Sequence, residues 1–215
     1  MRNVPAPSIP RRGRKNPGIL VLASASPRRS QLLREAGINF RVHPAAIREL
    51  DQLHRERGRP LPPRQIALRN ARLKALTVAR CFPRHCVLGA DTVVVLGRKI
   101  FGKPSNRHEA ETMLNCLNGR THRVITAFCL CRGKTLRCLV AVTSRVTLKR
   151  LTRRQIRVYL RLINPLDKAG AYAAQEHGDR IIRKVEGSWS NVVGLPMERL
   201  LREMRKLKPS LARAS

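Results

Sequence analysis

The stretch from residue 86 to residue 96 limits the possible folds more than any other part of this sequence. It reads CVLGADTVVVL, an apolar run typical of a buried strand, yet it contains Asp91. A carboxylate in such a strand is costly unless it is paired, hydrogen-bonded or bound to a metal. Gly89 and Ala90 leave room beside it for a ligand to approach. We interpret Asp91 as a residue that holds a divalent cation or activates water; a structural Asp satisfied by backbone donors is the alternative.

Strands and helices alternate along the rest of the chain. Two hairpin turns, at residues 97–98 and 132–134, predict antiparallel neighbours within a mixed sheet. This pattern is typical of an α/β fold. The predicted strands cover residues 19–23, 40–43, 86–96, 100–101, 123–131, 135–148 and 180–185. The predicted helices cover residues 27–36, 63–80, 107–117, 152–162 and 196–207, and the predicted loops cover 44–61 and 164–179.

The length of 215 residues suggests one domain, or one domain with two lobes. Residues 1–17 hold four prolines and five Arg or Lys, so we interpret them as a flexible basic extension before a domain over 18–207 and a tail over 208–215. We see neither the apolar core of a signal peptide nor a run of about 18 apolar residues. We therefore expect a cytoplasmic protein, without membrane association, whose six cysteines are reduced.

The formal net charge is +32, from 45 Lys and Arg against 13 Asp and Glu. Such a charge suggests a polyanionic partner: nucleic acid, an acidic membrane surface or a small phosphorylated substrate. Aromatic residues are only 3%, which leaves little material for stacking on bases, and the basic residues are spread along the whole chain. We therefore favour a general surface bias and keep nucleic acid as an alternative partner.

A phosphate site is indicated where the first predicted strand meets the first predicted helix. The segment reads SASPRR, with Ser24 at the strand end, Ser26 as the expected N-cap, and Arg28 and Arg29 in the first helical turn. Arginines usually avoid this position because the helix dipole is already positive there. Free backbone N–H groups and two guanidinium groups would together bind a phosphate. The alternative is a solvated helix start in an Arg-rich protein.

The predicted helix over residues 63–80 carries a second candidate. Ile66, Leu73 and Leu76 recur at helical spacing, and Lys74 lies on the adjoining face. From that position Lys74 could reach inward while its stem packs on apolar surface. The alternative, a side chain that extends to solvent, is favoured when this segment is considered by itself.

Two further candidates lie in turns or loops. Lys103 follows Gly102 in the turn FGKP and could point into a cleft as a phosphate-binding charge, although a lysine in a turn is usually solvated. Gln175 follows the segment DKAGAY, whose small residues suit a loop that closes around a ligand. Its amide can both donate and accept, so it could read the edge of a base such as a pyrimidine. A well-packed loop with a local ion pair is the alternative.

Seven segments, in this order, resemble the Maf family of nucleoside triphosphate pyrophosphatases over residues 18–207. One segment alone would be weak, but seven with sensible spacing are highly specific. The segments are LASASPRR (22–29), NARLKA (70–75), LGADTVVV (88–95), GKP (102–104), LNGRTHRVITA (117–127), DKAGAY with Gln175, and EGSWSNVVGLPMERL (186–200). The resemblance implies an elongated mixed sheet flanked by helices, with two lobes and a central cleft, related to the inosine triphosphate pyrophosphatases.

The resemblance also implies a reaction. A nucleoside triphosphate would be hydrolysed between its α- and β-phosphates, with Mg²⁺ or Mn²⁺, to the monophosphate and pyrophosphate. Asp91 matches the family's proposed general base, and Lys74 and Lys103 match catalytic cleft positions. Asp91 and Glu49 match the residues expected to hold the metal.

The substrate-binding positions implied by the resemblance are Ser24, Arg28, Arg29, Thr92 and Gln175. The combination of SPRR, DKAGAY and a following Gln resembles the dTTP/UTP pyrophosphatases, so we favour dTTP and UTP over 7-methyl-GTP or CTP, the alternatives within the family. Removal of excess or non-standard nucleotides would be the cellular role. Dimers are common among such enzymes, so a homodimer is compatible with the resemblance.

The chain departs from the family pattern at three positions. An acidic pair is replaced by Arg48-Glu49, Ala173 stands where Gly is usual, and Trp189 stands where Tyr is common.

Two other function classes remain as hypotheses. One is a nucleic-acid-binding protein that kept the fold, whose salt-sensitive binding would survive the loss of Asp91. The other is a binding role in cell division, for which the sequence offers no partner motif.

Overall fold

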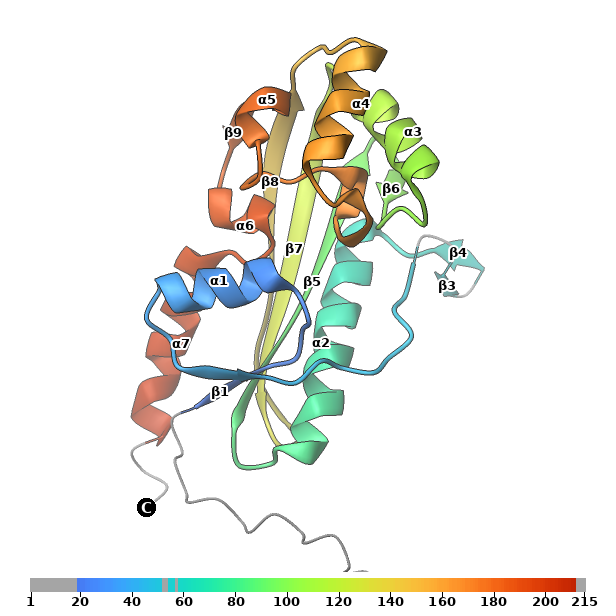
Figure 1. Ribbon diagram of the computed structural model, residues 1–215. Coiled ribbons are helices and arrows are strands. Elements are labelled where there is room, and N and C mark those ends of the chain that lie inside the picture. Colours follow the sequence, from blue (N-terminus) through green and yellow to red (C-terminus); the bar gives the residue numbers. More distant parts are fainter. Residues whose placement is uncertain (1–18, 52–53, 57, 212–215) are drawn as a thin grey trace, which may run out of the picture.

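The computed structural model describes residues 19–51, 54–56 and 58–211, which form helices around a seven-stranded sheet (Figure 1). The predicted extension, residues 1–17, and residues 212–215 of the predicted tail lie outside these ranges. The sheet has the order β2, β1, β5, β7, β8, β9, and β6 pairs with β5. Its strands are β1 (Leu20–Leu22), β2 (Phe40–Val42), β5 (Cys86–Leu96), β6 (Lys99–Phe101), β7 (Thr121–Arg132), β8 (Thr135–Leu148) and β9 (Ile182–Glu186).

The sheet is mixed, as predicted. β1 runs parallel to both β2 and β5, whereas β5, β7, β8 and β9 follow one another in antiparallel pairs. Both predicted hairpin turns are present: β5 turns into β6 at Gly97, and β7 turns into β8 at Gly133. Both glycines have positive φ, a conformation that residues with a Cβ seldom adopt. The α/β class predicted from the alternating pattern is therefore confirmed.

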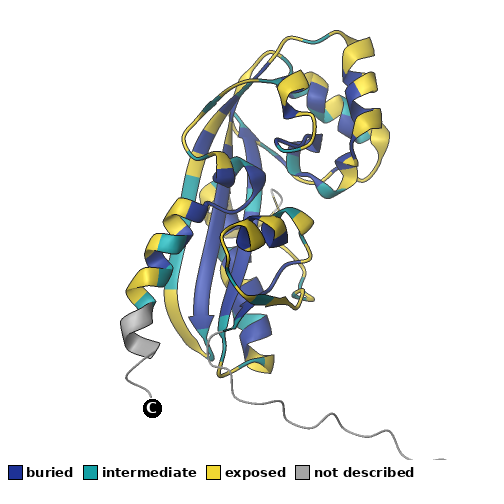
Figure 2. Ribbon diagram, turned by 60° about the vertical axis from the view of Figure 1, so that its left-hand side comes forward, coloured by how far each residue is buried: buried dark blue, intermediate teal, exposed yellow. Residues whose placement is uncertain are grey.

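Helices cover both faces of the sheet around β1, β5 and β7. The helix α2 packs on one face over a core of alanine and valine, and α1 and α7 pack on the other face over a leucine-rich core (Figures 1 and 2). Figure 2 shows the strands between them as buried. The helices are α1 (Pro27–Glu35), α2 (Pro63–Cys81), α3 (Arg107–Leu117), α4 (Arg153–Leu162), α5 (Gly178–Ile181), α6 (Trp189–Val193) and α7 (Met197–Leu211).

A second lobe forms where β5, β7 and β8 extend past these helices. There α3 and α4 pack with β6 and with two short 3-10 helices, η1 (Pro165–Asp167) and η2 (Ala169–Ala171), over a separate apolar core (Figure 1). Side-chain caps fix where both helices begin: Asn106 accepts from the backbone N–H of Glu109, and Thr152 forms a capping box with Gln155. The long strands therefore connect two lobes through one continuous sheet.

The structure corrects several local predictions. The segment predicted as a loop over 164–179 contains η1 and η2, and residues 180–181 of the predicted last strand belong to α5, so that β9 begins at Ile182. The segment predicted as a loop over 44–61 contains a small hairpin, β3 (Arg55–Glu56) and β4 (Arg59–Pro60). The helix α6 was not predicted, and α7 continues to Leu211, beyond the predicted helix end at residue 207. In α2 the buried face holds Ala67, Ala71 and Ala75, whereas Leu73 of the predicted apolar face is 41% exposed.

Candidate active site

A cavity of about 870 Å³ opens between the two lobes. Segments that are far apart in the sequence meet around it: the end of β1, the start of α1, the middle of α2 and β5, the turn after β6, and the η1–η2 segment. All predicted site residues except Gln175 line this cavity, namely Ser24, Arg28, Arg29, Glu49, Lys74, Asp91, Thr92 and Lys103. The structure therefore brings these eight residues together at one cavity.

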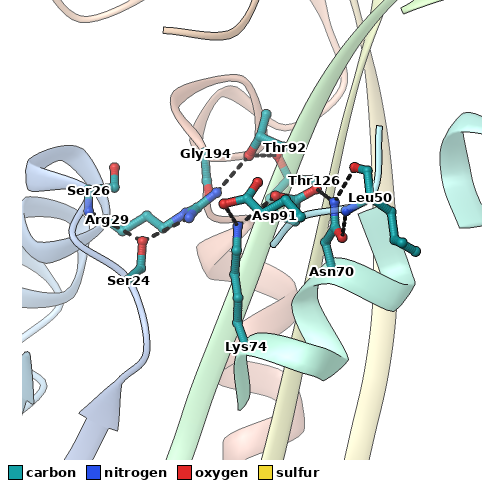
Figure 3. A network of polar contacts seen from close by, with 11 residues as sticks. Ser24, Ser26, Arg29, Leu50, Asn70, Lys74, Asp91, Thr92, Thr126 and Gly194 are labelled. Carbon is teal, nitrogen blue, oxygen red and sulfur yellow. Dashed lines mark hydrogen bonds and ion pairs between the residues drawn. The ribbon is translucent and has the colours of Figure 1, made fainter. Parts of the chain in front are cut away.

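Asp91 lies on β5, is 5% exposed, and has partners for both carboxylate oxygens (Figure 3). Lys74 Nζ donates to Oδ1 at 2.8 Å, and Asn70 Nδ2 donates to Oδ2 at 3.2 Å. Both partners belong to α2, which can approach the strand because Gly89 has no side chain. A Cβ on Gly89 would lie 2.3 Å from the carbonyl oxygen of Ala71. The buried carboxylate is thus paired and hydrogen-bonded, as the cost of its burial requires.

Lys74 connects two acidic residues at the floor of the cavity. Its Nζ lies 2.8 Å from Asp91 Oδ1 and 2.9 Å from Glu49 Oε1, and the residue is 8% exposed. The solvated orientation favoured for Lys74 from its own segment is therefore wrong, because the small residues of α2, rather than its leucines, face the sheet.

The two carboxyl groups around Lys74 differ in their environments. Burial raises the pKa of Asp91 above its usual range, although the Lys74 ammonium opposes this effect. Burial also acts to raise the pKa of Glu49, but the charges of Lys74, Lys103 and Arg29 outweigh it and lower that pKa. The site therefore holds one carboxyl with raised proton affinity next to one that stays ionised.

Asn70 is a site residue that sequence reasoning missed. Besides Asp91, its side chain bonds the backbone of Leu50 in both directions: Nδ2 donates to the carbonyl at 2.9 Å, and Oδ1 accepts from the N–H at 2.8 Å. This pair of bonds fixes the loop that carries Glu49. The available signal was spacing, because Asn70 lies four residues before Lys74 and so shares its helix face.

Arg29 is buried at the start of α1, and its guanidinium bonds three different segments (Figure 3). Nε donates to the carbonyl of Gly194 at 2.9 Å, Nη1 donates to Ser24 Oγ at 2.9 Å, and Nη2 donates to Thr92 Oγ1 at 3.1 Å. Burial lowers the pKa of Arg29, and the nearby Asp91 carboxylate opposes that shift. Three of its five N–H groups are thus used within the protein, which leaves two for a ligand.

The N-terminus of α1 presents unused donors to the cavity. Ser26 occupies the N-cap position, as predicted, but its side chain makes no capping bond. Within the described residues, the backbone N–H groups of Arg28 and Arg29 have no acceptor. The Arg28 side chain reaches across to η1, where Nη1 lies 3.4 Å from Asp167 Oδ2 and Nη2 donates to the Asp167 carbonyl at 3.2 Å. A contact between the two lobes therefore closes this side of the cavity.

The remaining two predicted residues lie in different settings. Lys103 is exposed at the cavity edge, and none of the described residues forms an ion pair with it. Gln175 is partly buried but is not among the lining residues; Tyr172, Ala173 and Ala174, just before it, line the cavity instead. The prediction that Gln175 contacts the substrate thus gains no support from this geometry.

The sequence profile described as Maf-like protein matches residues 19–207. The chain belongs to the Maf family. It is 42% identical to a dTTP/UTP pyrophosphatase of Koribacter versatilis (strain Ellin345) over 187 residues, which are 87% of this chain and 93% of that protein. It is 44% identical to a dTTP/UTP pyrophosphatase of Geobacter sp. (strain M21) over 182 residues, which are 83% of this chain and 90% of that protein.

A HAM1 protein from Coxiella burnetii aligns with this Maf protein at 13% identity and a TM-score of 0.39, over 62% of this chain and 74% of that one. At this TM-score the alignment adds nothing to the assignment.

All six cysteines are free thiols; Cys129 and Cys131 are buried, and Cys81 is exposed. None of the helices within the described residues is long and apolar enough to cross a bilayer.

Proposed function

We propose that this Maf protein hydrolyses dTTP and UTP between the α- and β-phosphates, releasing the nucleoside monophosphate and pyrophosphate. The relatives named dTTP/UTP pyrophosphatase, more than 40% identical over most of the chain, support the reaction and the substrates. The observation that carries the proposal is the buried Asp91, paired with Lys74 at the floor of a cavity whose rim is cationic. Removal of unwanted pyrimidine triphosphates before polymerases use them would be the cellular role.

The α1 side of the cavity would bind the triphosphate. The unpaired backbone N–H groups at the start of α1, the two unused N–H groups of Arg29 and the exposed ammonium of Lys103 all offer donors to phosphate oxygens. Arg28 would exchange its partly buried contact with Asp167 for a phosphate oxygen. These groups would hold the leaving pyrophosphate and stabilise its charge.

The donor set at the cavity floor fits a divalent cation. The carboxylates of Asp91 and Glu49 lie 2.8 and 2.9 Å from the Lys74 ammonium, so a cation that binds beside this nitrogen would have two carboxylates within reach. No group of three or more His, Cys, Asp and Glu gathers among the described residues, so substrate oxygens would have to complete the shell. Mg²⁺ is commonly held in this way, by one or two carboxylates and phosphate oxygens. When bound, the cation would neutralise phosphate charge.

Asp91 is the group we propose as general base. The raised pKa of Asp91 makes its carboxylate a better proton acceptor than an ordinary one. General bases work best when their pKa is closer to the pH at which the enzyme operates. Lys74 would keep the carboxylate ionised until it takes a proton from the attacking water at one of its oxygens. Asn70 would hold the other oxygen in place. The apolar walls of β5 and the η1–η2 segment would exclude other waters.

A product assay on the purified protein tests the proposal. With Mg²⁺ or Mn²⁺, dTTP and UTP should yield monophosphate and pyrophosphate, and Asp91→Asn should reduce turnover by at least about a hundredfold. Asp179→Asn changes an exposed carboxylate that does not line the cavity, so it should be as active as wild type. Turnover of only CTP or 7-methyl-GTP would overturn the substrate assignment. An active Asp91→Asn variant would overturn the role of Asp91.

A further inference from the structure

A chain of hydrogen bonds leads away from the cavity, from Arg29 through two threonines to α6. Arg29 Nη2 donates to Thr92 Oγ1 at 3.1 Å, Thr92 Oγ1 lies 3.0 Å from Thr126 Oγ1, and Thr126 Oγ1 donates to the carbonyl of Asn191 at 2.8 Å. Thr92 and Thr126 face each other across β5 and β7, where they are register partners (Figure 3). Thr126 and Asn191 are both 0% exposed, and neither lines the cavity.

The direction of this chain is fixed at both ends. A guanidinium can only donate, and a carbonyl can only accept. Since Thr126 gives its single proton to Asn191, the proton between the two threonines must come from Thr92. The Thr92 hydroxyl therefore points its proton away from the cavity and accepts from Arg29. It can meet a ligand only through a remaining lone pair.

The far end of the chain is anchored by the side chain of Asn191. Its Nδ2 donates to the Val124 carbonyl at 3.0 Å and to Ser144 Oγ at 2.9 Å, and Ser144 Oγ in turn donates to the Ser188 carbonyl at 2.9 Å. The five-residue helix α6 is thereby docked onto β7 and β8. Just after its last turn, the Gly194 carbonyl accepts from Arg29 Nε.

We infer that Thr126 and Asn191 are positioning residues, which act through Thr92 and α6 to hold the Arg29 guanidinium in one orientation toward the triphosphate. The inference rests on the proposed function and adds two residues to it. Arg29 bonds Ser24 on its own side of the cavity, and its two other hydrogen bonds within the described part of the chain, to Thr92 and Gly194, belong to this network. Without the Thr126 hydroxyl, Thr92 is free to turn its proton elsewhere, and the bond that fixes Nη2 of Arg29 is weakened.

Three substitutions separate positioning from packing. Thr126→Val keeps the shape and removes the hydroxyl, whereas Thr126→Ser keeps the hydroxyl and loses a methyl group. Thr121→Val is the matched control. Thr121 lies on β7, as Thr126 does, and forms the same kind of cross-strand bond with Thr147 of β8, but at an exposed site. We expect Thr126→Val to raise the KM for dTTP about tenfold, because a misplacement of about 1 Å can cost about a hundredfold and Arg29 keeps two of its three hydrogen bonds. Thr126→Ser and Thr121→Val should retain the wild-type KM.

KM is the informative quantity because partial unfolding lowers kcat through the active fraction but leaves KM unchanged. A wild-type KM in Thr126→Val, or an equal rise in Thr126→Ser, would overturn the inference. If Thr126→Val does not fold, Ser144→Ala replaces it: the loss of one anchor of Asn191 should raise KM several-fold, and an unchanged KM would overturn the inference.

A second readout separates this inference from the proposed function. If the wild-type protein does not turn over dTTP, the proposed reaction fails, and binding of inorganic pyrophosphate by calorimetry takes the place of KM. Weaker binding by Thr126→Val than by Thr126→Ser would then still support the positioning role. Equal binding by the two variants, or no binding by the wild type, would overturn it.

Discussion

Lys74 illustrates how far single residues can be interpreted from the sequence. Asp91 stood out because a carboxylate is rare in an apolar strand, and burial of that group requires a partner. The sequence could not identify the partner, since the leucines of its helix suggested a different buried face. Leu73 is exposed and Lys74 is buried, because only alanine and glycine allow α2 to lie close to β5. Backbone proximity, which has no strong sequence signal, decided the pairing.

Removal of the Lys74 charge should destabilise the protein by leaving Asp91 buried without its cation. We expect Lys74→Met to lower the free energy of unfolding by about 3 kcal/mol, the usual cost of breaking a buried pair. In Lys74→Met/Asp91→Asn the orphaned charge is absent, so most of that loss should be recovered. Urea unfolding of the two variants measures both values; equal destabilisation would contradict a buried charge pair.

His122 should make stability depend on pH. It lies buried on β7, with Nε2 2.7 Å from Tyr172 Oη, and burial lowers its pKa to about 4. In the unfolded chain the pKa is about 6.5, so as the pH falls below that value the unfolded state binds a proton that the folded state refuses. The free energy of unfolding should therefore fall by about 2 kcal/mol through His122 as the pH is lowered from about 7 to about 5.

The comparison with His122→Gln isolates this effect from the titration of other groups. The variant cannot bind the proton, so its unfolding free energy should fall by about 2 kcal/mol less than that of wild type over the same pH interval. Urea unfolding at both pH values gives the difference. Parallel losses in the two proteins would show that His122 is not the group responsible.

At the scale of whole elements, the prediction worked where side-chain periodicity was strong. The strand over residues 86–96 and the helix over 107–117 were predicted with the bounds that the structure gives. The prediction failed for short elements that are stabilised mainly by tertiary contacts. The five residues of α6 are too few for a helical period, and Ser188 and Asn191 hold the helix in place through bonds to the sheet. Such bonds are not visible before the fold is known.

The contact between α2 and β5 should be sensitive to any added side chain. A Cβ at position 89 would lie 2.3 Å from the Ala71 carbonyl oxygen and 2.5 Å from the Ala75 nitrogen, so the whole helix must shift. We expect Gly89→Ala to lower the free energy of unfolding by about 3 kcal/mol and to reduce turnover, since Lys74 and Asn70 move with α2.

The nearest obstacles to this Cβ are backbone atoms, so trimming a side chain should not relieve the clash. Gly89→Ala/Ala75→Gly should remain as unstable and as inactive as the single variant. If the double variant regains stability and activity, the Ala75 side chain, rather than the backbone of α2, would be what excludes a Cβ at position 89. Thermal unfolding and dTTP turnover, measured together, distinguish the two cases.

At the scale of the whole molecule, the net charge of +32 is the property that the site does not explain. The cavity uses only a few cations, whereas basic residues cover surfaces far from it, such as the outer face of α4 with Arg153, Arg154 and Arg161. A field of this sign draws an anionic substrate toward the protein and can raise its rate of encounter by about 10- to 1,000-fold at low salt.

The field should therefore appear in the salt dependence of catalysis. We expect kcat/KM for dTTP to fall between about 0.01 M and about 1 M salt, over which the screening length shrinks from about 30 to about 3 Å. Salt also weakens direct contacts with the triphosphate, so a distant charge change is needed as a control. Reversal of Arg153, Arg154 and Arg161 to Glu lowers the net charge from +32 to +26 without touching the cavity.

This reversal should leave α4 folded, because acidic residues at 153 and 154 suit its first turn, which has none, and so offset the unfavourable acid at 161 in its last turn. At low salt the charge-reversed variant should have a kcat/KM several-fold below that of wild type, and at high salt the two should converge, because screening removes the long-range field but not the chemistry. Equal kcat/KM values at low salt would mean that the surface charge plays no part in substrate capture. A difference that persists at high salt would instead indicate damage to the site.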